Sequence, residues 1–232
     1  MNTPQKKVLI TGANRGIGYE TAKKLKELGH FIILSARNSQ KGLAAASDLG
    51  VEFLLMDVAS ETSIASAATE YKQRFGDSLD ILINNAGIFP DKEESILNIQ
   101  PELINQALRT NTIGPILVTQ NFLPLLENSN DGARIINLSS KLGQLTSMSD
   151  TAPAYSISKT ALNALTRQQS AALTDKRISV NAASPGWVRT DMGGQNAYLS
   201  VQEGADTIVW LATEAPQSLT GQFIRDRKKI DW

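Results

Sequence analysis

The sequence has no cysteine and only one histidine among its 232 residues. The absence of cysteine excludes disulfides, thiolate catalysis and cysteine metal sites. The single histidine, His30, leaves no basis for a histidine metal site or a serine–histidine pair, and its place in an expected helix–strand turn indicates a structural role. Aspartate and glutamate form no clustered metal motif either. We therefore predict no bound metal.

An excess of charge of one sign is also missing, because 23 lysines and arginines balance 23 aspartates and glutamates. A balanced chain lacks the basic surface that nucleic acids or anionic membranes attract, so neither partner is expected. No apolar run approaches the ~20 residues of a membrane span. The N-terminal stretch MNTPQKKVLITG also lacks the apolar region of a signal peptide. These absences predict a cytoplasmic protein.

What the sequence does contain is an alternation of short apolar runs and longer amphipathic stretches. The short runs predict buried strands and the longer stretches predict helices. Strands are expected at 7–12, 31–36, 51–57, 79–87, 133–140, 178–186 and 220–224. Helices are expected at 16–28, 39–48, 60–75, 101–127, 154–173 and 201–213. Strands that are apolar on both faces and alternate with helices predict a parallel sheet covered on both sides.

A glycine-rich stretch, ITGANRGIG, joins the first expected strand to the first expected helix. Gly12 would let the strand end turn sharply, and Gly16 and Gly18 would let a pyrophosphate approach the backbone at the helix N-terminus. The spacing departs from G-x-G-x-x-G. On its own, the loop is equally well interpreted as a tight strand–helix turn.

The end of the second expected strand bears on the choice of dinucleotide. NAD sites usually carry Asp or Glu there, roughly 20 residues past the loop. This chain has SARN instead, and Arg37 offers a guanidinium fork that suits a 2′-phosphate. Arg15 in the glycine loop can reach the same phosphate. Each arginine alone could be merely solvated, but together, with the acid missing, they favour NADP over NAD.

Four motifs follow one another along the chain: TGANRGIG, NNAG at 84–87, YSISK at 155–159 and SPGWVRTDM at 184–192. In this order they resemble the short-chain dehydrogenase/reductase family, and the C-terminal part resembles its NADPH-dependent carbonyl reductases. The resemblance implies one α/β domain over 1–232, a Rossmann-type doubly wound parallel sheet with helices on both faces. It also implies NADP(H) as cofactor and a ketone or aldehyde as the small-molecule substrate.

The resemblance further implies a catalytic set of Asn111, Ser140, Tyr155 and Lys159, with Ser139 as the alternative to Ser140. Tyr155 and Lys159 share one helix face, where an ammonium lowers the phenol pKa from ~10. Tyr155 would be the general acid, and Ser140 would hold the substrate carbonyl. Lys159 would also bind the nicotinamide ribose. Asn111 would hold a water linked to Lys159, in a helix expected to break there.

The cofactor contacts that the resemblance implies are spread over most of the chain. They are Gly12, Asn14, Arg15, Gly16, Ile17, Gly18, Arg37, Asp57, Val58, Asn85, Ala86, Gly87, Tyr155, Lys159, Pro185, Gly186, Val188 and Thr190. Asp57 would contact the adenine side and also belong to a helix cap. Small residues at 85–87 would lie beside the adenosine ribose. Pro185, Gly186 and Val188 would line the nicotinamide, and Thr190 would hydrogen-bond its amide or the phosphates.

Two departures from the pattern carry expectations of their own. The stretch KLGQLTSMSDTAPA separates Ser140 from Tyr155, so the long insertion of some monomeric carbonyl reductases is missing. With the alanine-rich helix after Tyr155, this favours a homo-dimer or homo-tetramer. The segment after the P-G motif is short, which predicts a short substrate lid around 190–200 and a site open to bulky carbonyls.

Two other functions are compatible with part of the pattern. The first is a non-catalytic NADP-binding sensor or scaffold, against which the full Asn–Ser–Tyr–Lys set argues. The second is an NAD-dependent alcohol dehydrogenase, against which the arginine at the end of the second strand argues. The preferred interpretation is an NADPH-dependent reductase that transfers a hydride to a ketone or aldehyde.

Overall fold

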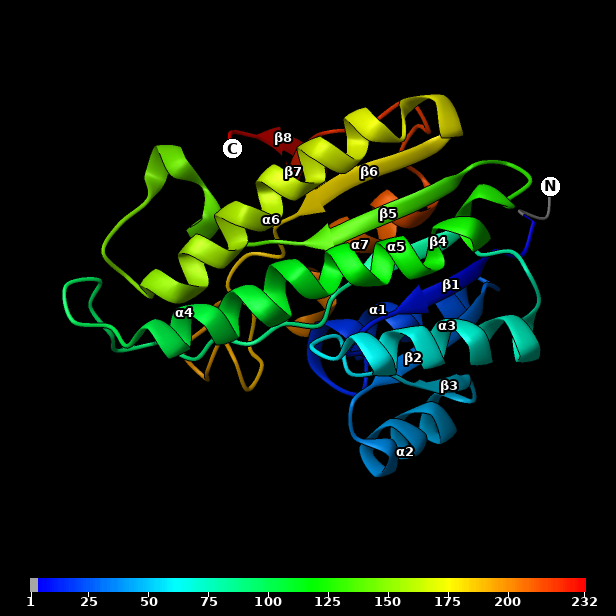
Figure 1. Cartoon of the computed structure of the whole chain (residues 1–232), viewed down its shortest axis with the longest axis horizontal. Coiled ribbons are helices and arrows are strands. Elements are labelled where there is room, and N and C mark those ends of the chain that lie inside the picture. Colours follow the sequence, from blue (N-terminus) through cyan, green and yellow to red (C-terminus); the bar gives the residue numbers. More distant parts are fainter. Residues whose placement is uncertain (1–3) are drawn as a thin grey trace.

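Across residues 4–232, which the computed structural model describes, eight strands form one sheet in the order β3-β2-β1-β4-β5-β6-β7-β8 (Figure 1). Their bounds are β1 (Lys7–Ile10), β2 (Phe31–Ala36), β3 (Glu52–Leu55), β4 (Ile81–Asn84), β5 (Ala133–Leu138), β6 (Ile178–Ala183), β7 (Phe223–Arg225) and β8 (Lys228–Ile230). The pairs from β3 through β7 are parallel, and β7 pairs with β8 in the antiparallel sense.

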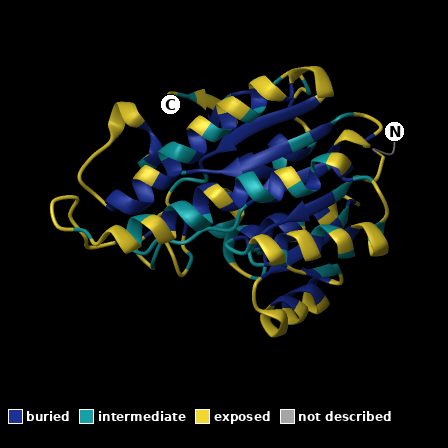
Figure 2. Ribbon diagram, viewed as in Figure 1, coloured by how far each residue is buried: buried dark blue, intermediate teal, exposed yellow. Residues whose placement is uncertain are grey.

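Helices cover both faces of this sheet. They are α1 (Gly16–Glu27), α2 (Ser39–Leu49), α3 (Glu61–Phe75), α4 (Pro101–Leu108), α5 (Gly114–Glu127), α6 (Pro153–Ala172) and α7 (Val201–Thr213). One apolar core joins the sheet to α1, α2 and α7, and a second joins it to α3 and α5. Figure 2 shows the buried strands between helices whose outer faces are exposed.

Local sequence explains where several helices begin and end. The Asn38 side chain accepts a hydrogen bond from the N–H of Lys41 and caps α2, which ends at Gly50 in the left-handed region (φ 60°). A capping box between Ser200 and Glu203 starts α7. These caps satisfy backbone groups that the helix itself leaves without partners.

The predicted fold class is confirmed, with differences in the bounds of several elements. The strands expected at 79–87 and 178–186 are shorter and end at Asn84 and Ala183, because the chain turns into loops there. Strand β8 was not predicted, since its exposed Lys228 and Lys229 give no apolar pattern; lysines of this kind protect a sheet edge. The helix expected over 101–127, with its predicted break near Asn111, has a π-helical turn at Arg109–Ile113.

The strand order reverses between β1 and β4, which are neighbours in the sheet although three crossovers separate them in sequence. In open α/β sheets, ligands bind in the crevice outside the carboxyl ends of the strands at such a reversal. The glycine loop follows β1, and residues 85–87 follow β4. The strand arrowheads of β5 and β6 point toward the same side, where the long loops before α4 and α6 lie (Figure 1).

Candidate active site

Thr11 holds the two loops of the crevice together. Its hydroxyl accepts hydrogen bonds from the N–H groups of Asn85 and Ala86, both at 3.0 Å. The side-chain amide of Asn85 donates back to the carbonyls of Thr11 (2.7 Å) and Gly12 (3.0 Å). The motif TGANRGIG and the motif NNAG, which are far apart in sequence, therefore form one rigid unit.

The glycines of the first loop are required by close packing. A Cβ on Gly12 would lie 2.9 Å from the Cα of Ala86, and one on Gly18 would lie 2.4 Å from the amide nitrogen of Asn85. Gly16 has a φ of +60°, which a side chain would disfavour. Helix α1 then starts with no side-chain cap and no acidic residue in its first turn. Its N-terminal N–H groups thus remain available to an anion.

Helix α6 places Tyr155 and Lys159 side by side in a buried position. Both side chains are almost fully buried, and the Lys159 ammonium lies 5.5 Å from the centre of the Tyr155 ring. Lys159 Nζ donates to the carbonyl of Leu138 at the end of β5 (2.7 Å). A Cβ on Gly87 would lie 3.6 Å from Lys159 Nζ, so the loop after β4 closes on the same group.

The electrostatics of this pair differ from the expectation that Lys159 lowers the pKa of Tyr155. Burial raises the pKa of the Tyr155 phenol to about 12, and a hydrogen bond with Ser140 acts in the opposite direction. Burial also lowers the pKa of the Lys159 ammonium to about 7. Desolvation disfavours the charged form of both groups. The phenol, whose ordinary pKa is already ~10, therefore holds its proton more firmly.

The structure separates the two serines that the sequence leaves open. Ser139 is buried, and its hydroxyl donates to the side-chain carbonyl of Asn163 on α6 (2.6 Å). Ser140 is half-buried, accepts from the N–H of Leu142 (3.2 Å) and hydrogen-bonds with Tyr155. Ser139 thus anchors the end of β5 to α6, while Ser140 faces the phenol.

Asn111 lies in the π-helical turn between α4 and α5, where the sequence predicts a break. Its side chain is fully buried and forms a closed pair with Ile88: Oδ1 accepts from the Ile88 N–H (2.8 Å), and Nδ2 donates to the Ile88 carbonyl (2.9 Å). Nδ2 also donates to Ser158 Oγ (2.9 Å). A Cβ on Gly87 would meet Asn111 Oδ1 at 3.2 Å, which places Asn111 beside Lys159.

The two arginines of the predicted phosphate clamp have different environments. Arg15 forms an exposed ion pair with Asp191, which belongs to the segment after the P-G motif. Arg37 follows β2 and is exposed, with no carboxylate within ion-pair distance among residues 4–232. The ion pair of Arg15 joins residues 176 positions apart and was not predicted.

The remaining predicted contacts lie at the same edge of the sheet. Asp57 accepts from the Ala59 N–H (3.0 Å) just before α3, and the buried Val58 follows it. Gly186 has a φ of +80°, and Val188 forms a β-bridge with Leu199 that closes the base of the segment 189–198. Its residues thus form a closed loop beside the crevice.

Several residues that organise the site give no signal in the sequence. Thr11 and Asn163 are polar residues whose partners lie on other elements. Asp91 comes from the loop between β4 and α4, yet its side chain is only 1% exposed. It accepts hydrogen bonds from the N–H groups of Ala154 (2.5 Å) and Tyr155 (3.2 Å). Only the T-G of the glycine motif could have pointed to one of these, Thr11.

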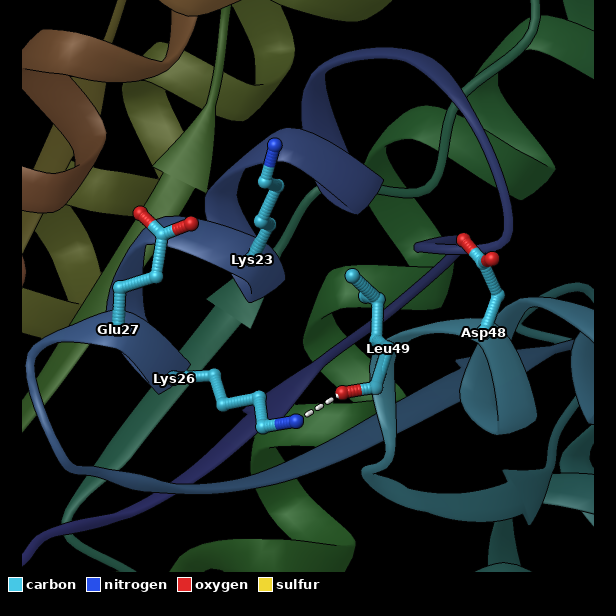
Figure 3. A pocket seen from close by; sticks show the side chains of 5 residues that line it. All are labelled: Lys23, Lys26, Glu27, Asp48 and Leu49. Carbon is cyan, nitrogen blue, oxygen red and sulfur yellow. Dashed lines mark hydrogen bonds between the residues drawn. The ribbon is translucent and has the colours of Figure 1, made fainter.

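A hollow elsewhere on the surface is not part of this arrangement. Figure 3 shows it between the C-terminal ends of α1 and α2, lined by Lys23, Lys26, Glu27, Asp48 and Leu49. The ammonium of Lys26 donates to the Leu49 carbonyl and ties the two helices together. The hollow lies at the opposite end of α1 from the glycine loop.

Comparison with known proteins agrees with this geometry. The family pattern described as short chain dehydrogenase matches residues 6–198. The chain belongs to the short-chain dehydrogenase family. As a member, it is an oxidoreductase whose fold binds a nicotinamide cofactor, and such enzymes act on small molecules.

Similar proteins include dehydrogenases and carbonyl reductases. The short-chain dehydrogenase anuI of Penicillium roqueforti is 36% identical and covers 96% of this chain and 95% of its own length. NADPH carbonyl reductase 1 of Sus scrofa is 30% identical over 100% of this chain and 96% of its own length. That alignment runs over 284 residues, so the pig enzyme has segments without a counterpart here.

A solved structure gives the same result. The NADPH-bound carbonyl reductase from chicken fatty liver superposes with a TM-score of 0.90 at 32% identity and covers 99% of this chain and 100% of its own. Carbonyl reductase Sniffer of D. melanogaster also superposes with a TM-score of 0.90, at 30% identity over the same shares of the two chains.

Within residues 4–232, no helix has the length and apolar character that a membrane crossing requires.

Proposed function

We propose that the protein is an NADPH-dependent reductase of ketones or aldehydes. The observation that carries the proposal is that Ser140, Tyr155 and Lys159 lie together where β5 ends and α6 begins. Asn111 and Gly87 lie beside them. A protonated phenol next to a hydroxyl donor is the arrangement that a carbonyl oxygen needs while it gains negative charge.

The crevice between β1 and β4 fits a dinucleotide. The uncapped start of α1 suits the pyrophosphate, for which Asn14, Gly16 and Ile17 supply backbone groups. The buried hydroxyls of Ser35 and Ser184, at the ends of β2 and β6, have no hydrogen-bond partner within the described chain. Ser35 lies two residues before Arg37, which is assigned to the 2′-phosphate. Ser184 directly precedes Pro185, which is assigned to the nicotinamide.

The remaining cofactor contacts divide along the same line. Asp57, Val58 and residues 85–87 would hold the adenosine end. Gly186, Val188, Thr190 and Lys159 would hold the nicotinamide end. The bound nicotinamide supplies the hydride, and the protein supplies orientation and proton transfer.

Each catalytic residue has one task toward the substrate. The Ser140 hydroxyl donates to the carbonyl oxygen and fixes its position. The Tyr155 phenol, which is protonated at neutral pH and whose pKa burial raises further, gives its proton to the same oxygen. Lys159, with a pKa of about 7, then returns a proton to the phenol oxygen. Asn111 holds the water that connects Lys159 to solvent.

The preference for NADPH over NADH rests on Arg37, on Arg15 and on the missing acid after β2. The relatives named NADPH carbonyl reductases support this choice. The short lid around 190–200 admits bulky carbonyls, and the missing insertion before Tyr155 favours a homo-dimer or homo-tetramer.

A panel of ketones and aldehydes of increasing size, tested with NADPH and with NADH, examines the proposal. We expect NADPH oxidation that depends on the carbonyl, with slower NADH oxidation. NADPH binding without turnover of any carbonyl would favour a sensor or scaffold. Equal rates with NADH would contradict the cofactor assignment, and turnover of one small carbonyl alone would contradict the open lid.

A further inference from the structure

The buried carboxylate of Asp91 contacts the catalytic helix, and the proposed function leaves it without a role. It lies in the loop between β4 and α4, whose neighbouring residues from Lys92 to Asn98 are exposed. Burying a carboxylate is costly unless strong hydrogen bonds replace its water. No cation lies within ion-pair distance of Asp91 among residues 4–232, so its partners must be found among neutral donors.

Those partners are the first backbone N–H groups of α6. The residue before the helix, Ala152, has a φ of +50° and provides no side-chain cap. Pro153 has no N–H, and the N–H of Ser156 already donates to the Ala152 carbonyl (2.9 Å). The N–H groups of Ala154 and Tyr155 therefore need an outside acceptor, and Asp91 supplies it. The positive end of the helix dipole also stabilises the carboxylate.

The same loop touches Tyr155 a second time. Phe89, two residues before Asp91, stacks on the Tyr155 ring with the ring centres 4.5 Å apart and the planes inclined by 27°. One short segment thus holds Tyr155 at its backbone and at its ring.

We propose that Asp91 is a positioning residue that fixes the general acid Tyr155 by capping α6 from the neighbouring loop. The inference rests on the proposed function for its effect on catalysis. Without the carboxylate, the segment 89–91 separates from α6, and the phenol loses its fixed distance to Ser140. Loss of position should reduce the rate of proton transfer more than it affects substrate or cofactor binding.

The test compares Asp91→Asn and Asp91→Ala with the matched variant Asp80→Asn. Asp80 also accepts a backbone hydrogen bond, from Lys7 (2.8 Å). It directly precedes β4, however, and so lies at the opposite end of the strands from the site. We expect kcat to fall about tenfold in Asp91→Asn, which keeps one acceptor oxygen, and further in Asp91→Ala, while KM and the NADPH dissociation constant change less than about threefold. Asp80→Asn should lower thermal stability without lowering kcat.

Amide hydrogen exchange at Ala154 and Tyr155 provides a readout that does not need turnover. We expect it to accelerate in both Asp91 variants and to stay unchanged in Asp80→Asn. Unchanged exchange, or a kcat that follows stability equally in all three variants, would overturn the role of Asp91. If the wild type reduces no carbonyl, the proposed function fails, and the exchange measurement still decides whether Asp91 holds Tyr155.

Discussion

The two halves of the sheet build their parts of the site by opposite means. Around β1 and β4, the site depends on the absence of side chains: a Cβ on Gly12 would lie 2.9 Å from the Cα of Ala86, and one on Gly18 would lie 2.4 Å from the side chain of Asn85. Around β5 and α6, the site depends on polar side chains that are buried, above all Tyr155 and Lys159. The first half should be sensitive to added atoms, and the second to the removal of single functional groups.

Tyr155→Phe tests the second half and has the largest expected effect. The change removes only the phenol oxygen and keeps the ring that stacks on Phe89. We expect kcat for carbonyl reduction to fall about 10²–10⁴-fold, the contribution of a positioned general acid. Steady-state NADPH oxidation measures it, and an NADPH titration serves as control because binding should be preserved. A kcat close to that of the wild type would assign the proton to another group.

Gly18→Ala tests the first half by adding one carbon atom. The new Cβ would meet the side chain of Asn85 and the backbone of Ala13. Relief of such overpacking moves the glycine loop, and we expect NADPH binding to weaken about 10- to 100-fold with a smaller change in kcat at saturation. The control is Gly29→Ala, whose Cβ has no atom within 4 Å but whose φ of +89° disfavours a side chain, so it should lower stability without weakening NADPH binding. Equal weakening in both variants would contradict a specific cradle.

Arg37→Asp tests which dinucleotide the first half selects. Loss of a charge-assisted hydrogen bond to a 2′-phosphate should reduce the preference for NADPH over NADH about 10- to 100-fold. The ratio of kcat/KM for the two cofactors measures this preference. Lys41→Asp, a charge reversal at another exposed residue nearby on α2, is the control. A variant that still prefers NADPH as strongly as the wild type would show that Arg37 does not select it.

Lys159→Met is expected to change the pH dependence of stability. Burial lowers the pKa of Lys159 from its usual 10.5 to about 7. Between these values the unfolded chain binds the additional proton, so the free energy of unfolding rises with pH by up to about 1.4 kcal/mol per pH unit. Above about pH 10 the raised pKa of Tyr155 reverses this trend.

Denaturant unfolding of the wild type and Lys159→Met at several pH values between these limits measures the difference in slope. The variant should lack the rise that Lys159 contributes. Parallel curves would mean that the ammonium keeps its charge in the folded protein, and Lys159 would then be able to lower the pKa of Tyr155 as first expected.

The sequence predicts most of the fold because its signals are local. An apolar run predicts β2 (Phe31–Ala36) and an amphipathic stretch predicts α7 (Val201–Thr213), both with the observed bounds. The placement of Tyr155 and Lys159 on one helix face follows from helical geometry. Strand β8 is not predicted from the sequence because two of its three residues are exposed lysines. Its place is determined by pairing with β7 rather than by its own pattern.

What the sequence cannot give are the partners of polar side chains across the fold. In the sequence, Asp91 is followed by charged and polar residues, and only the tertiary structure shows that it caps α6. Ser139 and Ser140 are identical neighbours in sequence, and the hydrogen bond from Ser139 to Asn163 separates their roles. The pKa values of Tyr155 and Lys159 likewise depend on burial, which their spacing does not reveal.

The measurement that tests the central claim most directly is the stoichiometry of the wild-type reaction. NADPH and a reactive diketone are mixed with the protein, and the alcohol formed is compared with the NADPH consumed. The account predicts one alcohol for each NADPH oxidised and no consumption of NADPH without the diketone. Tight NADPH binding with no alcohol formed from any carbonyl would contradict it.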